Sequence, residues 1–404
     1  MHVPAGWHRD SEGRLLIAGK PVAALAEAQG TPLFLYSAPM VAARVARFRA
    51  AMPAGLRLHY AVKANPMPAL LAHLAPLVDG FDVASAGELA RVRAAAPRSH
   101  IGFAGPGKRD GELAEALAQD VLLNVESAGE LERICRMAQA SGRAARVAVR
   151  VNPPFQLRGS GMKMGGMASP FGVDAADVPV LLREMRGAPL LFEGFHLFAG
   201  SQNLDWESVV DAQRQALDLA ARLAAEAPAR PRLVTLGGGF GVPYFPADRP
   251  LDVAAIGCAL AAAFGRLPAA LSETVFALEL GRWLVAEAGL YVVRVVDRKA
   301  SGGETFLVTD GGLHHQLAAT GNFGTVVRRN YPLAAVGAPD GAEETVHVVG
   351  CLCTPLDRLA DRARLPRLEP GDLLAVFMAG AYGRTASPEN FLGHPAPGEL
   401  LVFD

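Results

Sequence analysis

Short apolar segments alternate with longer segments of helical period through the middle of the chain, and this alternation restricts the fold most strongly. Eight segments are rich in β-branched and apolar residues and end near Gly, Pro, Asn or Ser, which is typical of strands. Between them, stretches such as AGELERICRMAQASG place apolar residues three and four positions apart, which is typical of amphipathic helices. The eight predicted strands are residues 56–63, 80–85, 100–105, 121–127, 146–152, 191–198, 232–238 and 274–280. Eight strand–helix units over roughly 225 residues predict an α/β chain that forms a (β/α)8 TIM barrel.

The remainder of the chain shows a different pattern. From about residue 283, strand-like segments follow one another without helices between them and are separated by Gly, Pro and Asp. They include GLYVVRVVDRKA, ETFLVTDGG, ETVHVVG, DLLAVFMAG and ELLVFD. We therefore predict a barrel over residues 35–282 and a separate β-rich domain formed by residues 1–34 and 283–404.

The charge balance excludes several classes of partner. Hydrophobic residues make up 51% of the chain and the formal net charge is -1, so no basic face is predicted for nucleic acid or for a membrane surface. A small molecule or a protein is the expected partner. No apolar run reaches the ~18 residues of a spanning helix, and the N-terminus lacks the layout of a signal peptide. These features predict a cytoplasmic protein.

The four cysteines are too few for a disulfide scaffold. Cys351 and Cys353 stand close together, but the chain has no second cysteine pair at zinc-finger spacing. We therefore predict reduced thiols and no metal-binding residues.

The C-terminal ends of barrel strands carry the chemistry of such folds, and polar or glycine residues recur at these positions. They are Lys63, Asp82, Ser85, Arg150, Asn152, His196, Gly237–Gly239 and Glu279. A neutral lysine amine can form a Schiff base with an aldehyde, although a lysine in this position also fits a salt bridge or a side chain that reaches solvent. His196 taken alone also fits a histidine of the core.

Two further segments suit a phosphorylated ligand. The run LGGGFGVPYF at residues 236–245 offers uncovered backbone N–H groups just before a helical segment, although tight turns also use such glycines. The segment ELGRW at residues 279–283 adds an acid and an arginine three positions apart, which by themselves also fit a surface ion pair. An aldehyde cofactor with a phosphate and a ring nitrogen would use all of these groups together.

Seven motifs follow the order of a known family. HYAVKAN, GFDVASAGEL, HLFAGSQN, LGGGFGVPYF, ELGR, CTPLD and GAYG together resemble the pyridoxal-phosphate decarboxylases of the alanine-racemase fold, which include diaminopimelate, ornithine and arginine decarboxylases. The resemblance runs from about residue 30 to the C-terminus. FAGPGKRDGEL, KMGGMASPFGVD, CTPLD and ASPENFLGHPAP are more similar to an exosortase-associated subgroup and to enzymes that decarboxylate amino acids attached to carrier proteins.

The resemblance implies a pyridoxal phosphate site. Lys63 matches the lysine that holds the cofactor as an internal aldimine, His196 matches the histidine that stacks on its ring, and Glu279 matches the acid that faces the pyridine nitrogen. The other matches are contacts of the phosphate or acids of the pocket. Phosphate contacts are implied for Ser201, Gly238, Gly239, Arg282 and Tyr382, and pocket acids for Asp82 and Glu88.

The resemblance also implies a reaction. The α-carboxylate of an L-amino acid, or of a centre like that of meso-diaminopimelate, leaves as CO2, and the quinonoid that results is protonated at Cα. Cys353 matches the cysteine that supplies this proton from the partner subunit, although a buried structural cysteine also fits the residue alone. A homodimer with shared active sites is therefore implied, in which Cys353 and Asp357 of one chain act with Lys63 of the other.

The substrate is left open. In the diaminopimelate and ornithine enzymes the residue after this cysteine is acidic, whereas this chain has Thr354, whose hydroxyl cannot compensate a buried ammonium. A neutral, amide-like or carrier-linked distal group is therefore favoured. Within RRNYP, the side chains suit a distal carboxylate or a phosphopantetheine phosphate, or they form a solvated basic turn. Candidate substrate contacts are Arg282, Arg328, Arg329, Tyr331, Thr354, Asp357 and Tyr382.

Three other functions use the same fold. A decarboxylase of a free diamino acid would tolerate Thr354. An amino acid racemase normally has a tyrosine as its second base and an arginine at the pyridine nitrogen, so Glu279 and Cys353 argue against it. A non-catalytic decarboxylase-like regulator would have a degraded cofactor site, and the intact Lys63 and Arg282 argue against that.

Overall fold

The computed structural model describes residues 4–404 except 158, 160, 161, 164, 323–328 and 338–341. The chain forms two compact units. The barrel unit comprises residues 45–242 and 249–283, and the β-rich unit comprises residues up to 44, 243–248 and 284–404. The domain boundaries at residues 35 and 282 stay a prediction, because helices α2 (Ala38–Ala51) and α10 (Arg282–Val285) each run across a division between the units.

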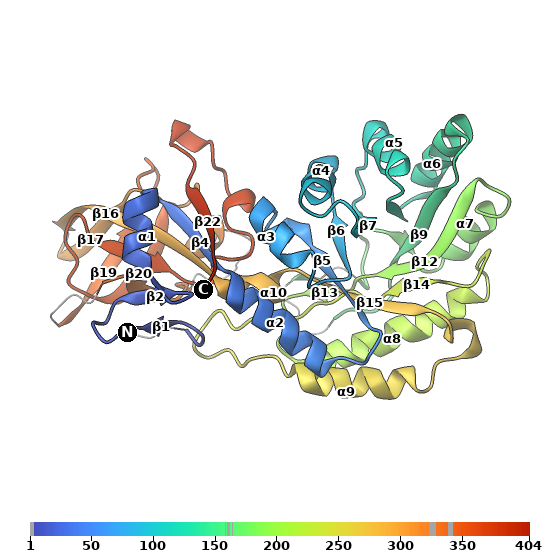
Figure 1. Ribbon diagram of the computed structural model, residues 1–404, viewed down its shortest axis with the longest axis horizontal. Helices are drawn as coiled ribbons and strands as arrows, with labels where there is room; N and C mark the ends of the chain where they lie inside the picture. The colour runs from blue at the N-terminus through green and yellow to red at the C-terminus, as the bar shows by residue number, and fades with distance from the viewer. Residues whose placement is uncertain (1–3, 158, 160–161, 164, 323–328, 338–341) are drawn as a thin grey trace. The chain divides into compact units, whose positions relative to one another are not determined.

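Eight parallel strands of the described chain close into a barrel (Figure 1). Each strand pairs with the next in sequence, β8 pairs with β9, and β15 pairs with β5. The strands are β5 (Arg57–Ala61), β6 (Gly80–Val83), β7 (His100–Phe103), β8 (Leu122–Val125), β9 (Ala145–Asn152), β12 (Leu190–Leu197), β14 (Leu233–Thr235) and β15 (Val275–Leu280). The predicted (β/α)8 barrel is confirmed, and each predicted strand overlaps an observed one.

The first predicted strand is longer than the observed one. β5 ends at Ala61, and Lys63 lies in the following 3₁₀ turn, η1 (Val62–Ala64). Asn65 holds this turn, because its backbone N–H donates to Val62 and its side-chain oxygen accepts a hydrogen bond from the N–H of Met67. Pro66 has no N–H group and cannot extend the strand ladder. Lys63 therefore stands just beyond the strand end.

Serine side chains define where two barrel helices begin. The helices of this unit are α3 (Pro68–Leu74), α4 (Ala86–Ala95), α5 (Asp110–Ala118), α6 (Ala128–Ser141), α7 (Val178–Glu184), α8 (Trp206–Ala224) and α9 (Val253–Phe264). Ser85 and Ser127 each accept a hydrogen bond from the backbone N–H of the glutamate three positions later. The repeated sequence SAGEL thus caps α4 and α6 in the same way. Every described helix is too short or too polar to traverse a membrane.

Aliphatic side chains fill the interior of the barrel. Leu122, Ala148, Leu233 and Ala277 form one buried cluster, and Val275 packs against it. These residues come from β8, β9, β14 and β15, of which β8 and β15 are not neighbours in the sheet, so the side chains meet across the interior. The barrel is therefore a packed core, and a ligand has room only at the ends of its strands.

The β-rich unit is built around one long strand (Figure 1). β16 (Gly289–Ser301) pairs with β4, β17 and β21. The other strands of this sheet are β4 (Leu33–Ser37), β17 (Glu304–Thr309), β18 (Leu333–Ala335), β19 (Glu343–Val349), β20 (Arg358–Pro366), β21 (Leu373–Val376) and β22 (Gly398–Val402). The N-terminal segment supplies β4, and before it a small sheet of β1 (His8–Arg9), β2 (Leu15–Ile17) and β3 (Lys20–Pro21) leads into helix α1 (Val22–Gln29).

A substitution at Gly257 can test how tightly α9 packs against the end of α2. It lies in α9, and a Cβ atom there would overlap the backbone carbonyl oxygen of Ala51 at the end of α2. The substitution Gly257→Ala should therefore lower the free energy of unfolding by about 1–3 kcal/mol, as overpacking does. Urea denaturation followed by circular dichroism measures this change.

Gly129 in α6 is the matched control, because a Cβ atom there meets no other atom within 4 Å. Gly129→Ala should raise stability by up to about 1 kcal/mol, since alanine has the higher helix propensity. Equal effects of the two substitutions would contradict the packing described for α9.

Candidate active site

Three buried polar side chains meet at the C-terminal ends of barrel strands. Asp82 lies on β6, His196 on β12 and Glu279 on β15. One oxygen or nitrogen atom of each lies within 4.8 Å of those of the other two. Nε2 of His196 donates a hydrogen bond of 2.9 Å to Oε2 of Glu279. The structure thus brings together three of the residues that the sequence singled out.

The two carboxyl groups of this cluster differ in their electrostatics. Burial, and after it the charge of Glu279, raises the pKa of Asp82 well above its usual range. Burial also acts to raise the pKa of Glu279, but the charge and the hydrogen bond of His196 outweigh it and hold that pKa below its usual value. Two carboxyl groups whose pKa values are shifted in opposite directions are typical of active sites in which one group stays protonated and the other is ionised.

Two atoms of the cluster lack hydrogen-bond partners among the described residues. They are Oδ1 of Asp82 and Nδ1 of His196. Asp82 is 6% exposed and His196 is 3% exposed. Because buried polar atoms nearly always have partners, these two indicate that a polar group of a ligand or a water belongs beside them.

Lys63 is exposed in the turn after β5. Its Nζ atom lies 5.8 Å from the centroid of the Phe198 ring, which follows β12. The sequence did not indicate Phe198, because a phenylalanine after an apolar strand carries no chemical signal of its own. The exposed position makes the lysine amine accessible to a carbonyl compound.

The glycine run after β14 approaches its neighbours too closely for any side chain. Gly237 and Gly239 have φ angles of 70° and 75°, which favour glycine. A Cβ atom at Gly238 would overlap the backbone carbonyl oxygen of Glu279, and one at Gly239 would lie 2.9 Å from Cδ2 of Leu157. The loop therefore keeps an uncovered backbone beside Glu279.

Two polar residues lie close in sequence to residues that contact this glycine loop. Ser201 lies in the short strand β13 (Gly200–Ser201), and the carbonyl oxygen of Gly200 is 3.0 Å from where a Cβ atom of Gly239 would stand. Arg282 begins α10, three positions after Glu279. A hydroxyl, a guanidinium and bare backbone together suit an anion such as phosphate.

Other polar side chains at the strand ends form hydrogen bonds with neighbouring groups of the protein. Arg150 donates a hydrogen bond of 2.7 Å to Glu126, and Asn152 donates one of 2.7 Å to Asp174. The carboxylate of Glu88 accepts a hydrogen bond from the backbone N–H of Ala84 and so helps to cap α4. These hydrogen bonds help to hold the strand ends, and a role of Glu88 in the pocket stays a prediction.

The remaining candidates lie in the β-rich unit. Cys353 is exposed, and the hydroxyl oxygen of Thr354 accepts a hydrogen bond of 3.3 Å from the N–H of Leu356. Tyr382 is partly buried and has a φ angle of 53°. Cys353 and Thr354 thus lie at an exposed turn between β19 and β20.

Asp357 is part of the internal structure of this unit. It is 2% exposed, its Oδ1 accepts a hydrogen bond of 2.6 Å from the N–H of Leu313, and its Oδ2 accepts one of 2.8 Å from the N–H of Leu352. A Cβ atom at Gly312 or Gly350 would overlap the carboxylate. Backbone N–H groups thus hold the carboxylate in place, and a contact of Asp357 with substrate stays a prediction.

An arginine and three aromatic rings form a second cluster in the β-rich unit. The guanidinium carbon of Arg329 lies 3.7 Å from the centroid of the Phe245 ring. The ring centroids of Tyr244 and Tyr331 are 5.0 Å apart. Arg328, which the sequence also indicated, lies outside the described residues.

Comparison with known proteins identifies the family. Residues 39–286 match the family described as pyridoxal-dependent decarboxylase, pyridoxal binding domain. An L-glutamyl-(BtrI acyl-carrier protein) decarboxylase from Niallia circulans is 36% identical over 396 residues, which cover 94% of this chain and 90% of that protein. A 2-((L-alanin-3-ylcarbamoyl)methyl)-2-hydroxybutanedioate decarboxylase from Staphylococcus aureus is 28% identical, over 94% of this chain and 96% of that protein.

Solved structures agree with this family. The crystal structure of diaminopimelate decarboxylase from M. jannaschi matches with a TM-score of 0.88 at 26% identity and covers 98% of this chain and 92% of that chain. The family match spans more than half of the chain, and the relatives align with nearly all of it. This chain therefore belongs to the pyridoxal-dependent decarboxylases, and pyridoxal phosphate is its cofactor.

Proposed function

We propose that this decarboxylase releases CO2 from an L-amino acid whose distal end is attached to a carrier protein. Thr354 is the observation that carries the proposal, because it replaces the acid expected of an enzyme for free diamino acids. A buried substrate ammonium beside a hydroxyl would lose its hydration without gaining an opposite charge. Asp357 is 2% exposed and its carboxylate is held by two backbone N–H groups, so we do not propose it as a replacement for the missing acid.

The names of two relatives support a substrate whose distal end carries no ammonium group. One relative acts on a glutamyl group carried by an acyl-carrier protein. The other acts on an alanine joined to hydroxybutanedioate through a carbamoyl group, which is a neutral amide. In both names the amino acid carries a larger group, and a hydroxyl such as that of Thr354 can hydrogen-bond to a carbonyl linkage.

Arg329 is the proposed contact for the phosphate of a phosphopantetheine arm. It is exposed, and its position 3.7 Å from the Phe245 ring holds the guanidinium plane against an aromatic face. A stacked guanidinium keeps its N–H edges available for bidentate contacts to phosphate. Tyr331 lies two positions later and is proposed to act with it.

The residues of the barrel unit fit pyridoxal phosphate. Lys63 is accessible for a covalent link through Nζ, and the bare backbone of Gly238 and Gly239 suits the phosphate. The orphaned Oδ1 of Asp82 and Nδ1 of His196 are polar atoms that a bound ring with polar substituents would satisfy. Phosphate contacts are proposed for Ser201, Gly238, Gly239 and Arg282, and also for Tyr382 of the β-rich unit.

The chain's own groups then have separate tasks. Bound pyridoxal phosphate supplies an electron sink for the pair that remains on Cα when CO2 leaves. Glu279, whose pKa is held low, is proposed to keep a proton on the ring nitrogen through its Oε atoms. His196 orients Glu279 through its 2.9 Å hydrogen bond. Cys353 is proposed to deliver the proton from Sγ to the substrate Cα.

We also propose a homodimer in which Cys353 of one protomer acts with Lys63 of its partner. A cytoplasmic location stays a prediction.

A free diamino acid such as diaminopimelate is the second candidate substrate. It is favoured by the match to a diaminopimelate decarboxylase structure over 98% of this chain. The two candidates differ in the charge required beside Thr354.

Lys63→Ala should abolish the visible absorbance of pyridoxal phosphate bound covalently to the protein, because no other amine is proposed to hold the aldehyde. Absorption spectra of the purified protein after incubation with the cofactor measure this. Lys20→Ala, at an exposed residue of the β-rich unit, is the control and should keep the band. A Lys63→Ala protein that also keeps it would remove Lys63 from the site.

Cys353→Ala should slow turnover by about 10²–10⁴-fold or divert the reaction toward transamination, because the proton donor for Cα is lost after CO2 has left. Product analysis by mass spectrometry separates the two outcomes. Cys258→Ala, at an exposed thiol of α9, should leave both rate and product unchanged. Unchanged rate and product in Cys353→Ala would count against this role.

The same variants test the shared site. Mixing Lys63→Ala with Cys353→Ala under subunit exchange should restore about a quarter of the wild-type activity, because half of the dimers are mixed and each carries one intact site. No recovery after verified exchange would place both residues of a site on one chain.

Thr354→Glu should raise kcat/KM for ornithine, lysine or diaminopimelate by about tenfold or more, because a carboxylate then compensates the distal ammonium. Thr354→Gln is the matched control, since it has nearly the same size and no charge. A gain with Glu and none with Gln supports the role of charge. No gain with any free diamino acid would refute the explanation based on Thr354.

A further inference from the structure

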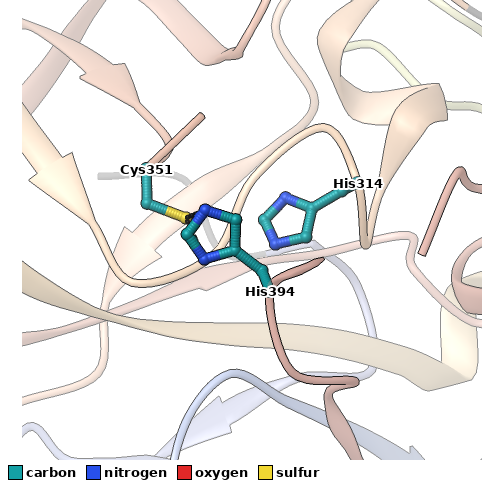
Figure 2. Close-up of side chains that lie close together, drawn as sticks. All are labelled: His314, Cys351 and His394. Carbon is teal, nitrogen blue, oxygen red and sulfur yellow. Dashed lines mark hydrogen bonds between the residues drawn. The ribbon is translucent and has the colours of Figure 1, made fainter. Parts of the chain in front are cut away.

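Three possible metal ligands lie together in the β-rich unit, and none of them is a residue proposed for decarboxylation. Figure 2 shows the sulfur of Cys351 pointing toward the ring of His394, with His314 beside that ring. One ligand atom of each residue lies within 4.8 Å of those of the other two. We propose that His314, Cys351 and His394 bind one Zn²⁺ ion, with a fourth position open to water or to another ligand.

The distances suit a tetrahedral ion. Sγ of Cys351 lies 3.8 Å from Nδ1 and 3.9 Å from Nε2 of His394. The ring centroids of His314 and His394 are 5.1 Å apart. Bond lengths of ~2.3 Å to sulfur and ~2.0 Å to nitrogen place tetrahedral ligand atoms roughly 3.5 Å from one another. Small side-chain movements are therefore enough to close the site around an ion.

His314 lacks the partners that a buried imidazole needs. The residue is 0% exposed, and neither of its ring nitrogens has a hydrogen-bond partner among the described residues. A neutral imidazole always has one nitrogen with a free lone pair, and leaving a buried acceptor unsatisfied costs about 1–3 kcal/mol. A bound ion would take up that lone pair.

Hydrogen bonds from neighbouring residues hold the three ligand segments in place. Asp357 accepts from the N–H groups of Leu313 and Leu352, which adjoin His314 and Cys351 in the sequence. His315 donates through Nε2 to the carbonyl oxygen of Pro395, which adjoins His394, at 3.0 Å. The ligands are thus brought together before any ion binds, which lowers the cost of ordering them.

His315 is not the fourth ligand, although its ring centroid is 3.7 Å from that of His314. Its Nε2 donates to Pro395, and its Nδ1 accepts a hydrogen bond of 3.0 Å from the hydroxyl of Tyr291. Both nitrogens are therefore used. Three protein ligands with an open fourth position match the coordination of reactive rather than purely structural zinc sites.

The donor set selects a transition metal. One thiolate and two imidazoles suit Zn²⁺ and disfavour Mg²⁺ and Ca²⁺, which prefer oxygen ligands. Cys351 lines a pocket of about 660 Å³ together with Thr354, so this ligand borders a cavity. The sulfur lies 3.6 Å from the carbonyl oxygen of Asp310, to which the thiol can donate. Binding of the ion releases that thiol proton.

The proposal revises the prediction of no metal site. The sequence showed Cys351 only beside Cys353, whereas the ligands come from three separated segments. Such a set has no spacing motif that a sequence reveals.

Metal titration of the pyridoxal-phosphate-loaded, full-length enzyme tests the proposal. Protein freed of metal with a chelator is titrated with Zn²⁺ against a chromophoric competitor, and Co²⁺ difference spectra report thiolate ligation. We expect one ion per chain and a thiolate-to-cobalt band. Cys351→Ser and His394→Gln should each weaken Zn²⁺ binding by more than about a hundredfold, because removing a ligand exceeds the effect of an outer-shell change.

Cys353→Ser and Cys258→Ser are the matched controls and should keep both the affinity and the cobalt band. Zn²⁺ should also raise the melting temperature of the wild type and of these controls but not of Cys351→Ser or His394→Gln. Zn²⁺ binding as tight in Cys351→Ser as in the wild type, or loss of the cobalt band in Cys353→Ser alone, would overturn the proposal. Absence of stoichiometric binding in the wild type would do the same.

Discussion

The pairing of β15 with β5 closes the barrel, and this contact brings together the polar side chains at the C-terminal ends of the strands. Glu279 on β15 stands opposite His59 on β5, and β5 in turn pairs with β6, where Asp82 lies opposite Ala61. Asp82 thus reaches Glu279 and His196 only because the last strand meets the first. The same approach explains the glycine run, since a side chain at Gly238 would overlap the carbonyl oxygen of Glu279.

Closure of the barrel also affects the pKa values of the carboxyl groups of Asp82 and Glu279. Burial in one pocket would disfavour two ionised carboxylates, and the pKa of Asp82 is accordingly raised. His196 supports the ionised form of Glu279 by its charge and hydrogen bond. The barrel unit therefore places an ionised carboxylate beside an uncovered backbone, the two groups proposed above for the ring nitrogen and the phosphate of the cofactor.

Much of the barrel was predictable, because eight apolar segments with helices between them fit few folds. The position of Lys63 was predicted to within two residues of the observed strand end, and the error arose because Asn65 and Pro66 form a turn that hydrophobicity alone does not show. The motif that contains Asp357 predicts a contact with substrate, and the structure adds two backbone hydrogen bonds to its carboxylate. The bond from Leu313 joins residues 44 positions apart, and no spacing rule predicts it.

The metal-ligand cluster was missed for the same reason. His314, Cys351 and His394 are brought together by sheet pairing and by hydrogen bonds that join the side chains of Asp357 and His315 to backbone groups. Asp357 therefore serves two purposes in the β-rich unit. It fixes the turn that carries Cys353 and Thr354, and it orders the segments that carry two of the proposed zinc ligands.

The central claim is that the substrate is an amino acid with a neutral, carrier-linked distal end. The most direct measurement is CO2 release by the wild-type holoenzyme, with kcat/KM compared between glutamyl and diaminoacyl carrier proteins and free meso-diaminopimelate, ornithine, lysine and arginine. We predict that a tethered substrate exceeds every free one by at least about a hundredfold. A free diamino acid that is decarboxylated as efficiently as any tethered substrate would contradict the account.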